Sequence, residues 1–104
     1  MQTFRITSAT TTTIVSKNTT NFETRAGFKY ISIANAQASN LVYVDLYLDD
    51  GTNQTYYFKK NLLWPGESIF MDEEITFDSM QHGLKLTTTT ADSSHGVSVN
   101  VIIN

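Results

Sequence analysis

The segment Val42-Tyr-Val-Asp-Leu-Tyr-Leu48 decides the fold class of this chain. Its four aliphatic side chains alternate with two tyrosines and an aspartate, which gives an extended strand one apolar and one polar face. Asp49-Asp-Gly-Thr-Asn53 follows, and then a second strand-like run, Thr55-Tyr-Tyr-Phe-Lys-Lys60. A glycine-containing turn between two such runs predicts a β-hairpin.

The same alternation recurs on both sides of this hairpin. Ile31 and Ile33 flank a polar residue, and a valine-rich run extends from Val97 to Ile103. Pro65-Gly66 and the loop from Ala91 to Gly96 are turn signals, and no helical period extends over ten residues. We therefore expect an all-β fold: a single immunoglobulin-like antiparallel β-sandwich of about seven strands. The predicted core comprises Val42, Val44, Leu46, Leu48, Leu84, Leu86, Val97, Val99 and Val101.

The beginning of the chain differs from the rest. Thr7 to Thr24 is rich in threonine, whose β-branch favours extended backbone. We expect residues 1–27 to form either the first strands of the sandwich or an extended arm that docks on a neighbour. Residues 28–104 form the predicted sandwich, and 104 residues suffice for one domain.

Charge and composition exclude several classes of partner. The chain carries 7 basic and 10 acidic residues, and Lys59-Lys60 is its single adjacent basic pair. A nucleic-acid binder needs a concentrated basic patch, so we expect no nucleic-acid partner. No apolar run approaches the ~20 residues of a membrane span, and the N-terminus lacks the order of a signal peptide. There is no cysteine, hence no disulfide or thiolate metal site.

The residues that could carry chemistry are explained by turns. His95 follows Asp92-Ser-Ser94 directly, whereas a catalytic triad needs its members aimed from separate elements. His82 precedes a glycine and is expected to be a solvated loop residue. The carboxylates at 49–50 and 72–74 do not have the spacing of a calcium-binding loop. We expect no catalytic residue, no metal site and no cofactor, so the protein is predicted not to be an enzyme.

Tyrosines instead suggest a contact surface. Tyr43 and Tyr47 point away from the predicted core, and Tyr30 and Tyr57 are expected on neighbouring strands. Tyrosine is enriched at protein interfaces, so these four residues are the predicted partner-binding site. The alternative is cross-strand pairing that stabilises the sheet without any partner. Trp64 is interpreted as a core or sandwich-edge residue.

Several segments together carry a family resemblance. They are Ile31-Ser-Ile-Ala-Asn35, Val44-Asp-Leu-Tyr-Leu-Asp-Asp-Gly51, Tyr56-Tyr-Phe58, Pro65-Gly-Glu-Ser-Ile-Phe-Met-Asp72 and Leu84-Lys-Leu86. With the C-terminal strand, they resemble small β-sandwich virion structural proteins of tailed phages, notably those of marine and cyanobacterial hosts. The resemblance covers roughly Phe28 to Asn104. It implies a virion component without enzymatic activity.

Three functions remain open from the sequence. The first is a capsid decoration or cement protein that binds the major capsid protein or other virion proteins, in multiple copies within a symmetric assembly. Such a protein would be made in the host cytoplasm and located in the virion. The second is a neck or tail component, which uses the same kind of contact. The third is a carbohydrate-binding or adhesin module, with Tyr43, Asp45, Tyr47 and Trp64 as its platform.

Overall fold

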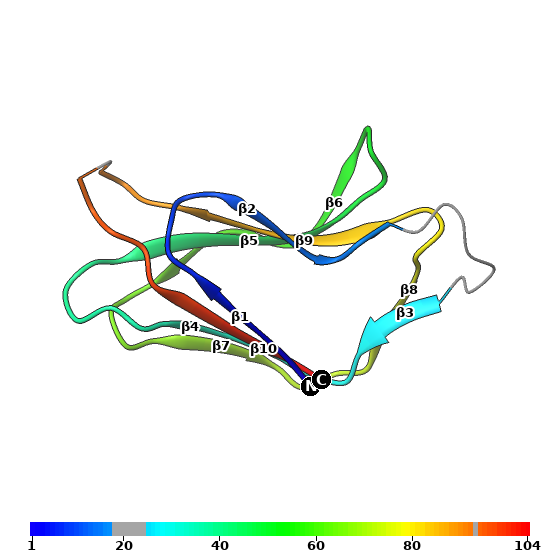
Figure 1. Cartoon of the computed structure of the whole chain (residues 1–104), viewed down its shortest axis with the longest axis horizontal. Coiled ribbons are helices and arrows are strands. Elements are labelled where there is room, and N and C mark those ends of the chain that lie inside the picture. The colour runs from blue at the N-terminus through cyan, green and yellow to red at the C-terminus, as the bar shows by residue number, and fades with distance from the viewer. Residues whose placement is uncertain (18–24, 93) are drawn as a thin grey trace.

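The computed structural model describes residues 1–17, 25–92 and 94–104, and within these ranges the chain is all strand, turn and loop (Figure 1). The strands are β1 (Gln2–Ile6), β2 (Thr11–Val15), β3 (Arg25–Phe28), β4 (Ile31–Asn35), β5 (Val42–Asp49), β6 (Gln54–Leu63), β7 (Ser68–Met71), β8 (Ile75–Asp78), β9 (Gly83–Thr89) and β10 (Val99–Ile103). No helix that could cross a membrane occurs in the described ranges.

The strands pair as one long hairpin. β5 pairs with β6, β4 with β7, β3 with β8, β2 with β9 and β1 with β10, all antiparallel. This hairpin is rolled up, because β10 also pairs with β4 and β9 also pairs with β5. The two layers in Figure 1 are the resulting sheets, β1-β10-β4-β7 and β2-β9-β5-β6, while β3 and β8 form a short pair at one end. A double sheet wound in this way is a jelly roll.

The predicted all-β sandwich is confirmed, but its strands are more numerous and differently ordered. The described residues form ten short strands where about seven were expected, and the order of these strands is that of a jelly roll, not of an immunoglobulin domain. Alternation shows which face of a strand is apolar, but it does not reveal which distant strand will be the neighbour. The sequence pattern therefore could not distinguish the two sandwiches.

Residues 1–17 contribute one edge strand to each sheet. β1, which precedes the threonine-rich segment, pairs with β10, and β2, which lies within that segment, pairs with β9. Residues 18–24, the last part of the threonine-rich segment, lie outside the described residues. The predicted boundary at residue 27 therefore stays a prediction.

The core lies between the two sheets and draws on both. Eight of the nine predicted core residues are buried, and Leu48 is half-buried against them. Val97 is buried ahead of β10, outside the strand. Each fully buried aliphatic side chain contributes about 1.5–3 kcal/mol of transfer free energy. Fully enclosed residues include Ile31, Ile33, Val42, Val44, Leu46, Leu84, Leu86, Val99 and Val101.

The predicted hairpin turn between β5 and β6 is confirmed. Gly51 adopts φ 101°, a conformation that glycine tolerates because it has no Cβ. The Asp49 carboxylate accepts a hydrogen bond from the Gly51 N–H (2.8 Å). The Asp50 carboxylate accepts from the backbone N–H groups of Thr52 (2.8 Å) and Asn53 (2.7 Å). These two carboxylates thus serve the turn.

β6 is a long edge strand, and a bulge interrupts it. Lys60 has φ 52°, and its N–H donates to the Asp45 carboxylate at 2.6 Å. The register with β5 shifts at this point. A bulge and exposed lysines on an edge hinder pairing with another chain. The Lys59-Lys60 pair is therefore explained by edge protection.

One buried polar side chain joins the loops at one end of the sandwich. Asn35 is 1% exposed, and its Nδ2 donates to the carbonyl oxygens of Asn40 (2.9 Å) and Leu63 (3.1 Å). Its Oδ1 accepts from the Gln37 N–H at 3.2 Å. Its backbone carbonyl accepts from the Gly66 N–H at 2.9 Å. Asn35 therefore ties the end of β4 to the β4–β5 loop, the end of β6 and the β6–β7 turn.

Candidate functional site

The four tyrosines predicted to bind a partner do not form one patch. Tyr43 and Tyr47 lie on the outer face of the β2-β9-β5-β6 sheet. Tyr30 precedes β4, and its ring lies 5.5 Å from that of Phe70, centroid to centroid. Tyr57 packs against the core instead, and its burial raises the pKa of its hydroxyl. The structure thus divides the set between two outer faces and the interior.

We call the outer surface of the β2-β9-β5-β6 sheet the tyrosine face. Tyr47 is only 8% exposed there, and its hydroxyl lies 3.0 Å from that of Thr87. The rings of Tyr47 and Tyr56 pack at 5.0 Å with an interplanar angle of 43°. These are contacts of cross-strand pairing, so Tyr47 presents little free surface. The face comprises Thr11, Thr13, Tyr43, Asp45, Tyr47, Asp49, Gln54, Tyr56, Leu62, Lys85, Thr87 and Thr89.

Charges on the tyrosine face are paired within the face. The Lys85 ammonium lies 2.9 Å from the Asp49 carboxylate. This contact lowers the pKa of Asp49, with help from the Gly51 N–H, and raises the pKa of Lys85. The Lys59 ammonium lies 4.9 Å from the centroid of the Tyr56 ring. The charged side chains of Asp49, Lys85 and Lys59 therefore all have partners within their own sheet.

The Asp49–Lys85 pair gives stability a pH dependence. Because the pKa of Asp49 is lowered on folding, the contribution of the pair is present above the unfolded pKa and disappears as the pH falls through the folded pKa. We expect Asp49→Asn to lower Tm slightly at neutral pH and to leave it unchanged in strong acid. Thermal unfolding of both proteins across this range measures the difference. High salt at neutral pH should also reduce the difference in Tm, since the ion pair is only partly buried and is screened by salt. If the two proteins differed in Tm by the same amount at every pH, the Asp49–Lys85 pair would not be the source of the pH dependence.

The outer surface of the other sheet has a different character, and we call it the small-residue face. Phe70 and Ile102 are its large apolar side chains, and they are 59% and 37% exposed. Arg5 is the one charged residue among the eight that point outward from the four strands. Surfaces that become interfaces are typically poor in charge at their centres. The face comprises Thr3, Arg5, Ser32, Ala34, Ser68, Phe70, Asn100 and Ile102.

Sequence reasoning missed the small-residue face. A signal for it is present in β4, where Ser32 and Ala34 alternate with buried aliphatic residues, and in β10, where Asn100 and Ile102 do so. Their importance depends on β4 and β10 being neighbours in the middle of one sheet. The strands are far apart in the sequence, so the pattern of either strand alone does not show a shared surface.

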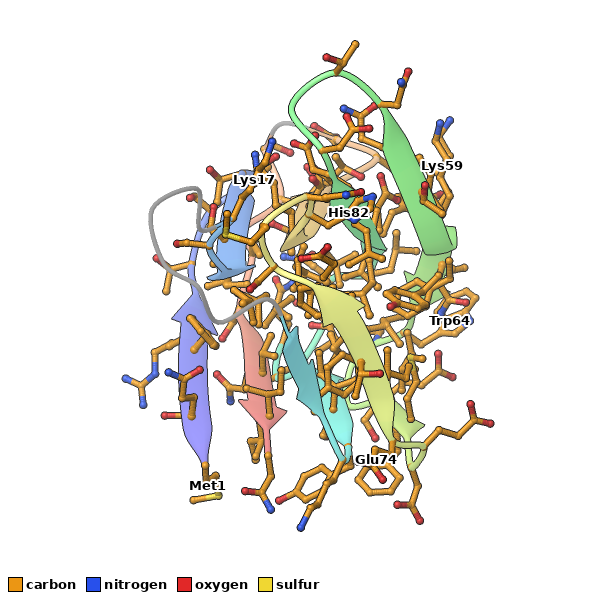
Figure 2. All side chains as sticks on the ribbon, turned by 90° about the vertical axis from the view of Figure 1, so that its right-hand side faces the viewer. Met1, Lys17, Lys59, Trp64, Glu74 and His82 are labelled. Carbon is orange, nitrogen blue, oxygen red and sulfur yellow. The ribbon has the colours of Figure 1, made fainter. Side chains whose placement is uncertain are left out.

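Trp64 lies at the edge of the sandwich, where β6 passes into the turn before β7. Its ring is 57% exposed, and Figure 2 shows it on the opposite side of the molecule from Met1, which precedes β1. Trp64 is therefore an edge residue and not part of the core. In the predicted glycan platform, the Asp45 carboxylate is engaged by the Lys60 N–H, and Tyr47 is largely covered. That platform would have little free polar surface to offer a sugar.

The segment around His95 is a turn. The Asp92 carboxylate accepts hydrogen bonds from the N–H and the hydroxyl of Ser94, both at 2.9 Å, and its pKa is lowered by them. The His95 N–H donates to the Asp92 carbonyl at 3.0 Å. Ser93 lies outside the described residues. Across the described ranges, no three His, Asp or Glu side chains gather closely enough to hold a metal ion.

Comparison with known proteins assigns the chain to no family. No protein-family model matches the chain, and no curated protein matches it in sequence. One similar solved chain comes from the structure of infectious bursal disease virus Gt strain, with a TM-score of 0.40 and 13% sequence identity. The match covers 99% of this chain and 25% of that one, so this chain spans about a quarter of its length. A similarity of this degree does not define a function.

Proposed function

We propose that this protein is a non-enzymatic structural component of a virion, and more specifically a capsid decoration protein that stabilises the shell through protein–protein contacts. The observation that carries the proposal is the strand order, which uses nearly the whole described chain for one jelly roll. Jelly rolls recur in viral capsid proteins as well as in lectins and cupins. Because a fold alone does not fix a function, the surfaces of the protein must also suit a contact role.

The surfaces support a contact role. On the tyrosine face, Lys85 pairs with Asp49 and Tyr47 with Thr87, while the small-residue face leaves Phe70 and Ile102 exposed. The resemblance of residues 28–104 to virion proteins of tailed phages points in the same direction.

The proposed mechanism is linkage between binding and assembly. A protein that binds the assembled shell and not its separate subunits stabilises the shell by RT ln(1 + [L]/Kd) per site, about 2.7 kcal/mol at a hundredfold excess over Kd. Because the shell has many identical binding sites, the total stabilising free energy is the sum of these contributions over all of them. The proposed partner is the major capsid protein, and the copies would follow the symmetry of the shell.

Co-sedimentation with purified particles from the source tests the proposal. Quantitative mass spectrometry gives the number of copies per major coat subunit, and a symmetric shell predicts on the order of hundreds of copies per particle. About six or twelve copies per particle, as the symmetry of a neck or tail requires, would overturn the decoration role and support the neck or tail alternative. Absence from the particle would overturn the virion role altogether. In that case, a glycan array probed with the isolated protein would test the adhesin alternative.

A further inference from the structure

A groove lies at the end of the sandwich opposite β3 and β8 (Figure 1). The connection between β1 and β2 forms one wall with residues 7–9, and the loop after β9 forms the other with residues 95–97. Thr89 and Thr90, at the end of β9, complete the lining. The volume of the groove is about 500 Å³, which lies in the range typical of small-molecule sites.

One buried polar atom of the groove has no protein partner. The Nδ1 atom of His95 is enclosed, and no described group forms a hydrogen bond with it. Native structures pair nearly all of their buried polar atoms, so an exception calls for an explanation. A neutral imidazole nitrogen donates or accepts one hydrogen bond, according to the tautomer. His95 can therefore engage a polar group of a ligand that enters the groove.

The rest of the lining is rich in hydroxyl groups. Thr7, Ser8, Thr89 and Thr90 each contribute one, and a hydroxyl both donates and accepts hydrogen bonds. Ala9 and Val97 add apolar surface. Among the described residues that line the groove, none is Asp, Glu, Lys or Arg. A ligand of matching chemistry is therefore uncharged, and it combines several hydroxyl groups with an apolar face.

We propose that this groove binds a neutral sugar ring, which carries hydroxyl groups around its rim and C–H groups on its face. The ring hydroxyls exchange hydrogen bonds with His95 and with the serine and threonine hydroxyls, while the C–H face lies on Val97 and Ala9. An ionic ligand would lose hydration here without gaining an opposite charge from the described lining. The site is separate from Tyr43 and Tyr47, and it does not depend on the proposed virion role.

Thr88 holds the first wall of the groove in place. Thr88 is 1% exposed, and its hydroxyl donates to the Ser8 carbonyl at 2.9 Å. Its N–H donates to the Thr10 carbonyl at 2.9 Å, and the Thr10 N–H donates to the Thr88 hydroxyl oxygen at 3.3 Å. These bonds tie residues 8–10 to β9. Because the wall is already ordered, less conformational entropy is lost when a ligand binds.

Asp92 holds the second wall. Its carbonyl accepts hydrogen bonds from the His95 N–H and from the Thr90 hydroxyl, both at 3.0 Å. Its carboxylate accepts from the Ser94 N–H at 2.9 Å. The turn that carries His95 is thereby fastened to the end of β9, the same strand that holds the first wall. Both walls are thus positioned by one strand of the sandwich.

NMR titration of the ¹⁵N-labelled full chain tests the site. The probes are D-glucose, D-galactose, D-mannose and N-acetyl-D-glucosamine, added separately. A single ring makes few contacts, so we expect a Kd of about 1–10 mM for at least one of them, with shifts concentrated on residues 7–9, 89–90 and 95–97. D-Glucuronate, a charged probe with the same ring size, should bind about tenfold more weakly than the best neutral sugar.

Three results of this titration would overturn the proposal. The first is the absence of shifts with every neutral sugar. The second is a set of shifts that concentrates around Tyr43 and Tyr47 instead of the groove. The third is binding of D-glucuronate as tight as that of the best neutral sugar, because the site would then not be selective for uncharged ligands.

Two variants and a matched control test the geometry. Ala9→Phe fills the groove without removing a polar group and should abolish binding; Ala9 is exposed, so the fold should tolerate the change. His95→Ala removes the unpartnered nitrogen and should weaken binding about tenfold. His82→Ala alters the other histidine, which precedes β9 at the far end of that strand from Thr89, and should bind like the parent.

Circular dichroism and Tm of each variant show whether the fold is intact. A folded Ala9→Phe variant that binds like the parent would show that the sugar lies elsewhere and would overturn the proposal. Equal weakening by His95→Ala and His82→Ala would also overturn it, because the effect would then not come from the groove.

Discussion

Replacing Asn35 by aspartate is expected to lower the free energy of unfolding by about 3–5 kcal/mol at neutral pH, although the two side chains have nearly the same shape. The Asn35 amide nitrogen donates to two backbone carbonyl oxygens, those of Asn40 and Leu63. An aspartate oxygen at this place cannot donate when ionised, and it would face both carbonyls from a site that is 1% exposed. The change therefore removes two hydrogen bonds and leaves a buried charge without a counter-ion.

The effect of Asn35→Asp should depend strongly on pH. Burial among carbonyl oxygens raises the pKa of the new carboxyl group in the folded state above its unfolded value. The variant is then most stable below the unfolded pKa and loses stability as the pH rises, so its deficit relative to the parent should shrink in mild acid. Urea unfolding at several pH values measures the deficit.

Asn100→Asp provides the matched control for the change at Asn35. Asn100 is exposed on β10, and its carboxylate variant would remain hydrated beside Arg5. We expect a change within about 0.5 kcal/mol at all pH values. A similar deficit at both positions would show that the buried hydrogen bonds of Asn35 contribute little.

Leu46→Ala is expected to be the most damaging of the simple core truncations, at about 2–5 kcal/mol. Leu46 is fully buried at the centre of β5, directly opposite Leu86 of β9 and Phe58 of β6. β5 is held between two strands, so the backbone cannot shift to close the cavity left by the side chain. For a domain of this size, such a loss is a large part of the total stability, typically 5–15 kcal/mol.

Leu48→Ala is the appropriate comparison for Leu46→Ala. Leu48 lies on the same strand and the same face, two residues on, but it is only half-buried near the β5–β6 turn. We expect about half the loss or less, because less apolar surface leaves water and the site can relax. Chemical denaturation with fitted m-values checks both variants. Equal losses would mean that the two ends of β5 are equally well packed.

The sequence predicted which side chains of a strand are buried better than it predicted which strands pair with one another. The alternation in Val42–Leu48 correctly identified Val42, Val44 and Leu46 as buried, because period 2 is a property of a single strand. The same rule placed Leu48 in the core. The β5–β6 hairpin, however, projects beyond the body of the sandwich (Figure 1), and Leu48, near the turn of this hairpin, is only half-buried. The jelly roll itself depends on which distant strands pair, and no local pattern contains that information.

The four tyrosines predicted to bind a partner also depend on strand pairing that the local sequence pattern does not contain. Tyr47 points outward, as its position in the strand requires, yet Tyr56 and Thr87 on the neighbouring strands cover it. Whether an outward side chain is available to a partner thus depends on cross-strand neighbours. Tyr30 remains beside an exposed surface only because the pairing of β4 with β7 brings Phe70 to it. The partner-binding role of these tyrosines stays a prediction.

The place of β10 has a consequence for how the chain reaches this structure. β10 is the last strand in the sequence, but it lies in the middle of its sheet, between β1 and β4 (Figure 1). β1 therefore has no strand to pair with until the chain has been synthesised as far as β10. Contacts between residues so distant in sequence slow folding, because a long loop must close before they stabilise anything. We therefore expect the β5–β6 hairpin to form early and the sheet that contains β10 to be completed last.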